Sequence, residues 1–427
     1  MFEFASRLAF ADTRRLLATA AILPAIALSA APAHATDGYY SHGYGAQSKG
    51  LAGAGLAYPK DSLALATNPA AATALGNRAD VGIDVFSSTR RASFRGTGLD
   101  RTYDGDGSKV AFIPEAGWVR QLNDKVAVGV VAYGNGGMIT NYKSNPFARY
   151  GATGAAGVEL QQLFISPTVA YRLAEHHSVG VSLNLAGQTF RARGIQPFAG
   201  FSQSPADFTN RGVDVQFGYG VRVGYLGQVT DRVSVGAFWQ SKTAFNAFEK
   251  YKGLFAEAGD FDAPSTYGAG VAFKATPRLD LVADWRRIEF SGIAAVGTPL
   301  SPLFAGRPFG ADDGPGFGWR DSDVVKVGAN YKVNDQWQVR AGYGHARNPV
   351  PSSQTLLNIL APGVVTDQYT VGATWTRPSG LEVSGYALYA PEHKVRGSGS
   401  IPAPLGGGEA DISLGEAVAG VSVGWKY

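Results

Sequence analysis

Residues 213–225 read Val-Asp-Val-Gln-Phe-Gly-Tyr-Gly-Val-Arg-Val-Gly-Tyr, with an apolar residue at every odd position and a polar residue or glycine at every even position. Successive side chains of a β-strand point to opposite faces, so this pattern predicts a strand with one apolar and one polar face. The same alternation recurs at 81–85, 126–130, 179–185, 233–239, 267–273, 279–285, 325–331, 337–343, 369–375 and 421–427. We therefore expect an all-β fold.

The connections between these strands alternate in length. Short polar turns are expected at 122–125, 174–177, 230–232, 275–278, 333–336 and 377–380, and long loops near 94–108, 143–157, 194–211, 248–263, 291–319, 348–366 and 391–410. Six hairpins and one further strand at each end give about fourteen strands. An even number of antiparallel strands, with short turns on one side and long loops on the other, is typical of a transmembrane barrel of the bacterial outer membrane.

A soluble β-sandwich or propeller is the alternative, because its strands show the same alternation. The polar face, however, carries charged residues that would be costly in a dry core: Asp214, Arg222, Asp284, Arg286 and Lys326. A wet lumen removes that cost. Aromatic residues also lie near strand ends, as in the interfacial girdles of barrels: Trp239, Trp285, Trp337, Trp375, Trp425 and Tyr427. The terminal Tyr427 resembles the signal that the barrel-assembly machinery reads.

The composition excludes several classes of protein. The chain has 427 residues, 17% of them charged, a formal net charge of +4 and no cysteine. The lack of cysteine excludes a disulfide scaffold, a thiolate metal site and a cysteine nucleophile. After residue 35 no segment approaches the roughly 20 apolar residues of a membrane helix, and no basic cluster indicates nucleic-acid binding. We expect no cofactor and no metal.

Residues 1–35 have the order of an export signal. Arg14 and Arg15 precede an apolar run at 16–31, and Ala33-His34-Ala35 follows as a small-x-small cleavage site. An amphipathic helix of the mature protein is the alternative, and the arginine pair resembles the twin-arginine signal. Since nothing indicates a prefolded, cofactor-bound protein, we expect ordinary unfolded secretion and a mature chain that begins at Thr36.

Residues 36–76 do not follow the barrel pattern. They are rich in alanine and glycine, and Pro59 and Pro69 interrupt their short helical stretches. About forty residues with small side chains cannot form a core alone. We expect them to pack inside the lumen as a hatch, with the barrel at 77–427; a flexible periplasmic leader is the alternative.

Several segments together resemble the FadL/TodX transporters, outer-membrane channels for long-chain fatty acids and aromatic hydrocarbons. They are the Gly/Ala-rich stretch 43–55, Asn68-Pro69-Ala70, Asn123-Asp124-Lys125 before Tyr133-Gly134-Asn135-Gly136-Gly137, the stretch 331–337 and Pro349-Val350-Pro351. The resemblance implies a monomeric barrel of fourteen strands, a hatch that carries Asn68, Pro69 and Ala70, and a kink in the third strand that opens a lateral gap.

A kink in the third strand also agrees with its residues. Gly134, Gly136 and Gly137 interrupt it, and glycine in a strand permits a bulge or bend. Asn68 offers an amide to backbone groups left unpaired at such a bend. An ordinary glycine-rich strand end is the alternative.

No group of residues predicts catalysis. The six histidines are scattered, and His345, near the outer end of a strand, has no nucleophile partner apparent in the sequence. An outer-membrane lipid-modifying enzyme with a Ser-His pair is thus the weakest alternative, and we predict no catalytic residue.

A general diffusion porin for small polar solutes is the stronger alternative. Such a channel has an open, charged constriction, whereas the long loops here are apolar. Phe198 and Phe201 lie in one loop, Leu254 and Phe255 in the next, and Leu356-Leu357-Asn358-Ile359-Leu360 in a third. Apolar loop residues indicate either a hydrophobic binding site or contact with lipopolysaccharide.

An amphiphilic acid would need a cation for its carboxylate. Gly318-Trp319-Arg320-Asp321 resembles the family segment whose basic residue contributes to the head-group site, and strand parity turns Arg320 inward. Arg191 and Arg193 end the fifth strand but share the parity of the lipid-facing Leu185, so they point inward only after a bulge. Pairing with rim carboxylates or lipopolysaccharide phosphates is the alternative role of these arginines.

The sequence thus predicts a passive uptake channel in the outer membrane of a Gram-negative bacterium. A hydrophobic ligand is captured by the outer loops and released laterally into the bilayer near the kink in the third strand. The expected partners are that ligand, outer-membrane lipids, lipopolysaccharide and the barrel-assembly machinery.

Overall fold

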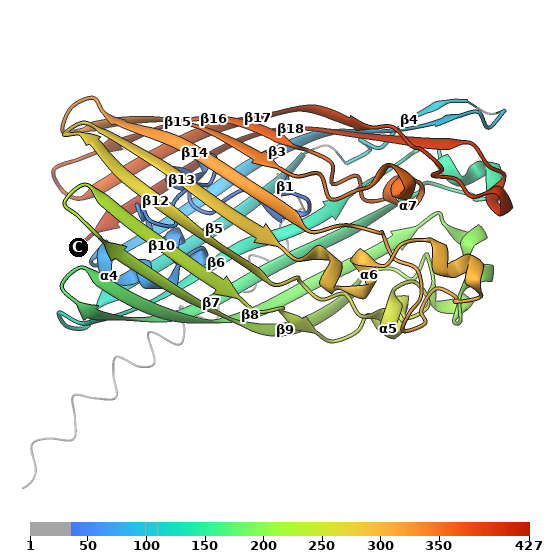
Figure 1. Ribbon diagram of the computed structural model, residues 1–427, viewed down its shortest axis with the longest axis horizontal. Helices are drawn as coiled ribbons and strands as arrows, with labels where there is room; N and C mark the ends of the chain where they lie inside the picture. Colours follow the sequence, from blue (N-terminus) through green and yellow to red (C-terminus); the bar gives the residue numbers. More distant parts are fainter. Residues whose placement is uncertain (1–35, 99, 109) are drawn as a thin grey trace, which may run out of the picture. The chain divides into compact units, whose positions relative to one another are not determined.

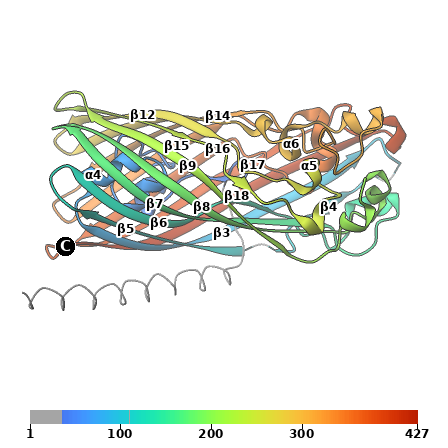
Figure 2. The same ribbon diagram turned by 90° about the horizontal axis from the view of Figure 1, so that it is seen from below.

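A computed structural model describes residues 36–98, 100–108 and 110–427, which all belong to one compact unit, so the predicted export signal lies outside the described residues. In this part of the chain fourteen long strands form a closed antiparallel barrel (Figure 1, Figure 2). These strands are β3 (Arg78–Arg95), β5 (Val110–Gln121), β6 (Val126–Ile139), β7 (Gly157–Ala174), β8 (His177–Arg193), β9 (Asp214–Gln228), β10 (Val233–Gln240), β12 (Thr266–Thr276), β13 (Leu279–Ile288), β14 (Ser322–Lys332), β15 (Trp337–Ala346), β16 (Asp367–Thr376), β17 (Leu381–Val395) and β18 (Glu409–Lys426).

The barrel closes because the last strand pairs with the first. β18 runs antiparallel to β3 from Lys426 opposite Arg78 to Glu409 opposite Arg95. Closure leaves no sheet edge, and one sheet closed on itself is not a sandwich. The predicted fold class is therefore confirmed, and the short turns gather at one end with the long loops at the other (Figure 1).

The apolar positions of the alternating pattern face outward. In β9, for example, the outward side chains of Phe217 and Tyr219 are 66% and 67% exposed. Arg222, on the opposite face of the same strand, is buried. Trp239, Trp285, Trp337 and Trp425 are also exposed on this face. No helix among the described residues is long and apolar enough to span a membrane.

Residues 36–76, here called the plug, lie inside the barrel and appear in blue in Figure 1. The plug contains β1 (Thr36–Asp37), β2 (Tyr40–Ser41), α3 (Ala46–Lys49), η1 (Ser62–Ala66), η2 (Pro69–Ala71) and α4 (Ala72–Leu75). It contacts the barrel wall at well-separated strands: Lys49 bonds Asp84 of β3, Thr73 bonds Ser178 of β8, and the Gly55 amide bonds Asp284 of β13.

The charges on the inner face differ from the expectation of a wet lumen. Asp284 accepts hydrogen bonds from the amides of Gly55 and Leu56 at 2.7 and 3.0 Å, and Lys326 pairs with Asp37 at 2.9 Å. Both barrel side chains are buried and bonded to the plug, Asp284 through one of its two carboxylate oxygens. We had expected water in the lumen to remove the cost of burying these charges. Direct pairing with the plug offsets that cost instead.

The long loops fold over the outer end of the barrel and carry short elements. They are β4 (Thr102–Asp104), η3 (Pro146–Tyr150), η4 (Gln196–Phe201), η5 (Pro205–Asp207), β11 (Ala244–Phe245), η6 (Glu249–Tyr251), α5 (Ala256–Gly259), η7 (Phe290–Gly292), α6 (Ala294–Gly297), η8 (Ser301–Ala305), η9 (Ser352–Gln354), α7 (Thr355–Asn358) and η10 (Ala403–Leu405). Together with residues of the strands and the plug, their apolar side chains form the largest hydrophobic cluster in the described part of the chain.

Candidate functional site

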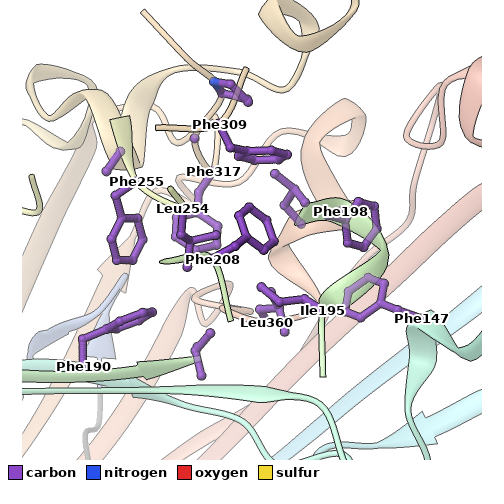
Figure 3. Close-up of a pocket in the computed structure, with 15 residues that line it drawn as sticks. Phe147, Phe190, Ile195, Phe198, Phe208, Leu254, Phe255, Phe309, Phe317 and Leu360 are labelled. Atoms are coloured by element: carbon purple, nitrogen blue, oxygen red, sulfur yellow. The ribbon is translucent and has the colours of Figure 1, made fainter. Parts of the chain in front are cut away.

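An apolar pocket, the outer cavity, lies among the long loops (Figure 3). The space between its lining atoms, including the part open to solvent, is about 510 Å³. It is lined by Phe147, Val158, Phe190, Ile195, Phe198, Phe208, Leu254, Phe255, Ala295, Phe309, Pro315, Gly316, Phe317, Leu357 and Leu360. No lining residue is ionisable, so the cavity offers contact to apolar groups alone.

Side-chain caps and ring contacts hold the cavity wall in place. Asn145 caps η3 by accepting a hydrogen bond from the Phe147 amide at 2.8 Å, and its own amide donates to the Gly194 carbonyl. This pair of bonds ties two loops together, and the Phe147 ring then meets the Phe198 ring edge to face at 5.3 Å. Such edge contacts stabilise aromatic pairs beyond the area that they bury.

A second pair of loops closes the opposite wall. The Phe309 amide donates to the Phe201 carbonyl, and the Phe309 carbonyl accepts from Gln203, both at 3.0 Å. The Phe309 ring packs on Phe208 with centroids 5.4 Å apart. The cavity therefore depends on contacts between segments about a hundred residues apart.

The predicted ligand-binding residues are only partly brought together. Phe198, Leu254 and Phe255 line the outer cavity, as do Leu357 and Leu360 of the third apolar loop. Phe201 does not, because its side chain is 45% exposed.

The prediction that Arg320 points into the lumen is wrong. β14 begins at Ser322, so the strand parity that we extended to Arg320 does not reach it. The side chain of Arg320 is exposed, whereas that of the preceding residue, Trp319, is buried. The indole Nε1 of Trp319 donates to Asn358 at 2.6 Å.

Arg191 does not point inward either. No bulge interrupts β8 before its end, so Arg191 keeps the outward parity of Leu185 and bonds Glu159 of β7. Arg193 shares this parity. Consequently the outer cavity has neither of the two cations predicted for a carboxylate.

An aromatic cluster connects the outer cavity to the plug. Phe255 of the cavity wall packs on Phe261 at 4.9 Å, and Phe261 packs on Tyr39 at 6.1 Å. Tyr39 also contacts Phe290 and Trp319. The sequence analysis did not identify Tyr39 or Trp319 as part of the site. Each is a large aromatic residue that directly follows a glycine, Gly38 or Gly318, and this pattern is a signal of close packing.

The predicted glycines of the third strand lie at a break in the sheet. β6 pairs with β5 only from Gln121 opposite Ala127 to Ala116 opposite Ala132, whereas β5 continues along β3 to Val110. On its other side β6 shifts register by one residue between Gly134 and Gly136. The outer halves of β5 and β6 are thus not paired with each other.

The plug occupies this break. Tyr40 of β2 pairs with Gly136, and the Gly137 amide donates to the Tyr39 carbonyl at 2.9 Å. A Cβ at Gly136 would lie 2.3 Å from that carbonyl oxygen, so only glycine permits the approach.

A second space, the inner cavity, lies beside the break. It is lined on the β6 side by Gly137, Met138 and Ile139, and on the β3 and β18 side by the charged residues Arg90 and Glu416. Ala361 lines it as well, while the preceding Leu360 lines the outer cavity. Two consecutive residues, Leu360 and Ala361, thus line the two cavities.

The Asn68-Pro69-Ala70 motif lies far from the break. The Asn68 amide donates to the carbonyls of Leu56 and of Tyr225 in β9, at 3.0 and 2.9 Å, and its oxygen caps η2 at the Ala70 amide. The prediction that Asn68 serves unpaired groups of the third strand is wrong. Glycines of β8 and β9 instead provide the space where the motif docks.

His345 lies on the outward face of β15. Its Nδ1 is 3.0 Å from Asp367 of the neighbouring strand, and both side chains are exposed. This arrangement is a side-chain contact between adjacent strands on the outer surface.

A sequence profile described as outer membrane protein transport protein (OMPP1/FadL/TodX) matches residues 26–390. The chain belongs to this family. The fold of this FadL/TodX-family chain is similar to a Pseudomonas aeruginosa FadL homologue, with a TM-score of 0.69, 18% identity, and coverage of 91% of this chain and 99% of that one. The corresponding values for the P. putida toluene transporter TodX are 0.66, 18%, 90% and 99%.

The Ralstonia pickettii toluene transporter TbuX is also similar, with a TM-score of 0.63, 17% identity, and coverage of 90% of this chain and 99% of that one. No curated protein sequence matches the chain. The family consists of outer-membrane β-barrels that transport hydrophobic compounds, and its solved members are transporters rather than enzymes.

Proposed function

We propose that this chain is a passive uptake channel for uncharged hydrophobic molecules of monoaromatic size. The observation that carries the proposal is the outer cavity, whose fifteen lining residues include no ionisable side chain. A buried carboxylate without a cation is strongly disfavoured, so a neutral hydrocarbon suits this cavity better than a fatty acid. The similar solved structures TodX and TbuX are described as toluene transporters, which supports a ligand of monoaromatic size.

Two cavities in series suggest the route. A solute leaves the outer cavity past Leu360, enters the inner cavity beside Gly137, and passes between β5 and β6 into the bilayer once the plug strand at Tyr39 and Tyr40 moves. This lateral release avoids water, in which each methylene is less stable by about 0.8 kcal/mol. No energy source is required, so flow follows the concentration gradient.

A general diffusion porin fits the lumen less well. The plug crosses the barrel and bonds to β3, β8 and β13. An open aqueous path for polar solutes would have to displace these contacts.

The test is uptake by liposomes that contain the purified protein. Radiolabelled toluene, palmitate and a disaccharide are compared at equal concentration. We expect rapid entry of toluene, weak entry of palmitate and none of the disaccharide. Preferred transport of the disaccharide would support the porin, and preferred transport of palmitate would refute the assignment to neutral solutes.

A matched pair of variants connects transport to the cavity. Leu254→Trp reduces the space that Leu254 lines, whereas Phe201→Trp changes an exposed residue outside it. We expect toluene uptake to fall about tenfold in the first variant, a change of about 1.4 kcal/mol, and to remain parental in the second. Equal uptake by both would separate transport from the cavity.

A further inference from the structure

A third hollow, the rim pocket, opens on the outside of the barrel above β13, β14 and β15. Its volume is about 880 Å³, and it lies between the β13–β14 loop and the β15–β16 loop. The Arg320 amide donates to the Pro349 carbonyl at 2.8 Å and so connects the two loops. Transport as proposed above makes no use of this pocket.

Three arginines line the rim pocket, and two of them lack a partner. Arg287 is held by Asp321 at 3.0 Å and by Asp323 at 3.1 Å. The exposed guanidinium groups of Arg320 and Arg347 form no ion pair or side-chain hydrogen bond with any described residue. Since Asp321 and Asp323 both bond Arg287, the three arginines and two aspartates leave a net charge of +1, and the unpaired guanidinium groups are those of Arg320 and Arg347.

The rim pocket lies at the level of lipid head groups. Trp285 and Tyr343 are exposed on the outward face of β13 and β15, where aromatic girdles mark the membrane interface. Arg287 follows Trp285 by two positions and Arg347 follows Tyr343 by four, with the same parity. At about 3.3 Å per residue, these arginines extend beyond the girdle by about 7 to 13 Å.

An apolar hollow lies on the same strands, on the membrane side of the girdle. Its volume is about 1080 Å³, and outward residues of β12 to β15 line it, among them Phe273, Leu281, Ala329 and Ala341. Tyr343 also lines it, four positions before Arg347 of the rim pocket. Along β15 one outward residue, His345, lies between the apolar hollow at Tyr343 and the anion site at Arg347.

We propose that the rim pocket binds the phosphate groups of lipopolysaccharide in the outer leaflet, with its acyl chains in the apolar hollow below. Guanidinium groups bind phosphate by paired, charge-assisted hydrogen bonds. A free phosphate would use the arginines but not the hollow, whereas a phosphorylated, multiply acylated lipid uses both. Arg320 therefore serves a membrane lipid and not the transported solute.

The test is native mass spectrometry of the full-length protein in detergent with added diphosphorylated lipid A. We expect binding by the parent, and binding reduced about tenfold or more in the variant R320Q/R347Q, which corresponds to about 1.4 kcal/mol. The control R232Q/R278Q removes two exposed arginines of the short turns and should bind as the parent does. Equal lipid binding by all three proteins would overturn the proposal.

Competition distinguishes the possible ligands. Inorganic phosphate at millimolar concentration should displace little lipid, and lipid A without phosphates should bind weakly. Full displacement by inorganic phosphate would show a site for the free ion, and displacement by palmitate would show a substrate site; either result refutes a lipid site. R320Q/R347Q should also keep heat-modifiable mobility and parental toluene uptake, which excludes misfolding as the cause of lost lipid binding.

Discussion

The carbonyl oxygen of Tyr39 accepts a hydrogen bond from the amide of Gly137 at 2.9 Å, so the plug takes a pairing position on β6 that β5 leaves empty. This bond places β1 and β2 of the plug beside the inner cavity, which Gly38 and Gly137 both line. Any lateral exit at this point therefore involves movement of Tyr39.

Filling the inner cavity is expected to stop lateral release. Gly137→Leu adds a branched side chain to the cavity wall, so toluene uptake into liposomes should fall about tenfold, a change of about 1.4 kcal/mol. Gly385→Leu is the control, because a Cβ there meets only the Gly420 carbonyl oxygen at 3.7 Å. Parental uptake by Gly137→Leu would favour an axial path through the plug.

Removal of the central plug cation is expected to destabilise the plug. Lys49 pairs with Asp84 at 2.5 Å and Glu115 at 2.8 Å, and all three side chains are buried. Lys49→Met leaves two buried carboxylates without their cation, which costs about 3–5 kcal/mol. Planar-bilayer conductance should rise as the plug loosens.

The control for this prediction is an exposed ion pair. Lys332→Met breaks the pair with Asp335 in a short turn, which contributes about 0–1 kcal/mol. Its conductance should equal that of the parent. Low conductance of Lys49→Met as well would mean that other contacts suffice to hold the plug.

The two functions of Asn68 can be separated by substitution. Asn68→Asp keeps the oxygen that caps η2 but loses the donors to Leu56 and Tyr225, whereas Asn68→Ala loses both. Loss of a cap costs about 1 kcal/mol, so hydrogen exchange at the Ala70 amide should accelerate in Asn68→Ala more than in Asn68→Asp. Equal exchange in the two variants would assign the stabilisation to the donors alone.

The loop at 255–261 should loosen as the pH rises. Burial, followed by the nearby carboxylate of Asp262, raises the pKa of Asp260 from 3.8 to about 7. The folded loop binds this proton more tightly than the unfolded loop does, so stability is lost as the pH rises toward 7 and the carboxyl ionises. Hydrogen exchange at Phe255 and Phe261, corrected for the intrinsic rate, should increase between about pH 4 and pH 7 and level off above that range.

Asp260→Asn removes the titrating group and should abolish this pH dependence. Lys242, which pairs with Asp262 at 2.6 Å, remains in place in that variant. A pH dependence that persists in Asp260→Asn would assign it to another group.

The barrel could be predicted from local sequence because the alternation within each strand shows which of its side chains face outward and which face inward. In β9, Phe217 and Tyr219 are outward and Arg222 is inward whatever the neighbours are, since the side-chain period of a strand is two. The turns at 122–125 and 333–336 likewise carry their own Asn-Asp signals, and Asn123 and Asn334 accept the amide hydrogen bonds that shape them.

The candidate site depended on contacts that no local pattern records. The sequence determined the strands, their faces, the plug and the apolar character of the outer loops. Only the tertiary structure decided that Phe198 and Phe255 line one cavity and that Phe201 lies outside it. It also decided that Arg320 precedes the start of β14, so that the alternation of that strand does not set the direction of its side chain. The physical reason is that alternation is enforced within each strand by its own backbone, whereas a loop side chain takes its place from packing against segments far away in the chain.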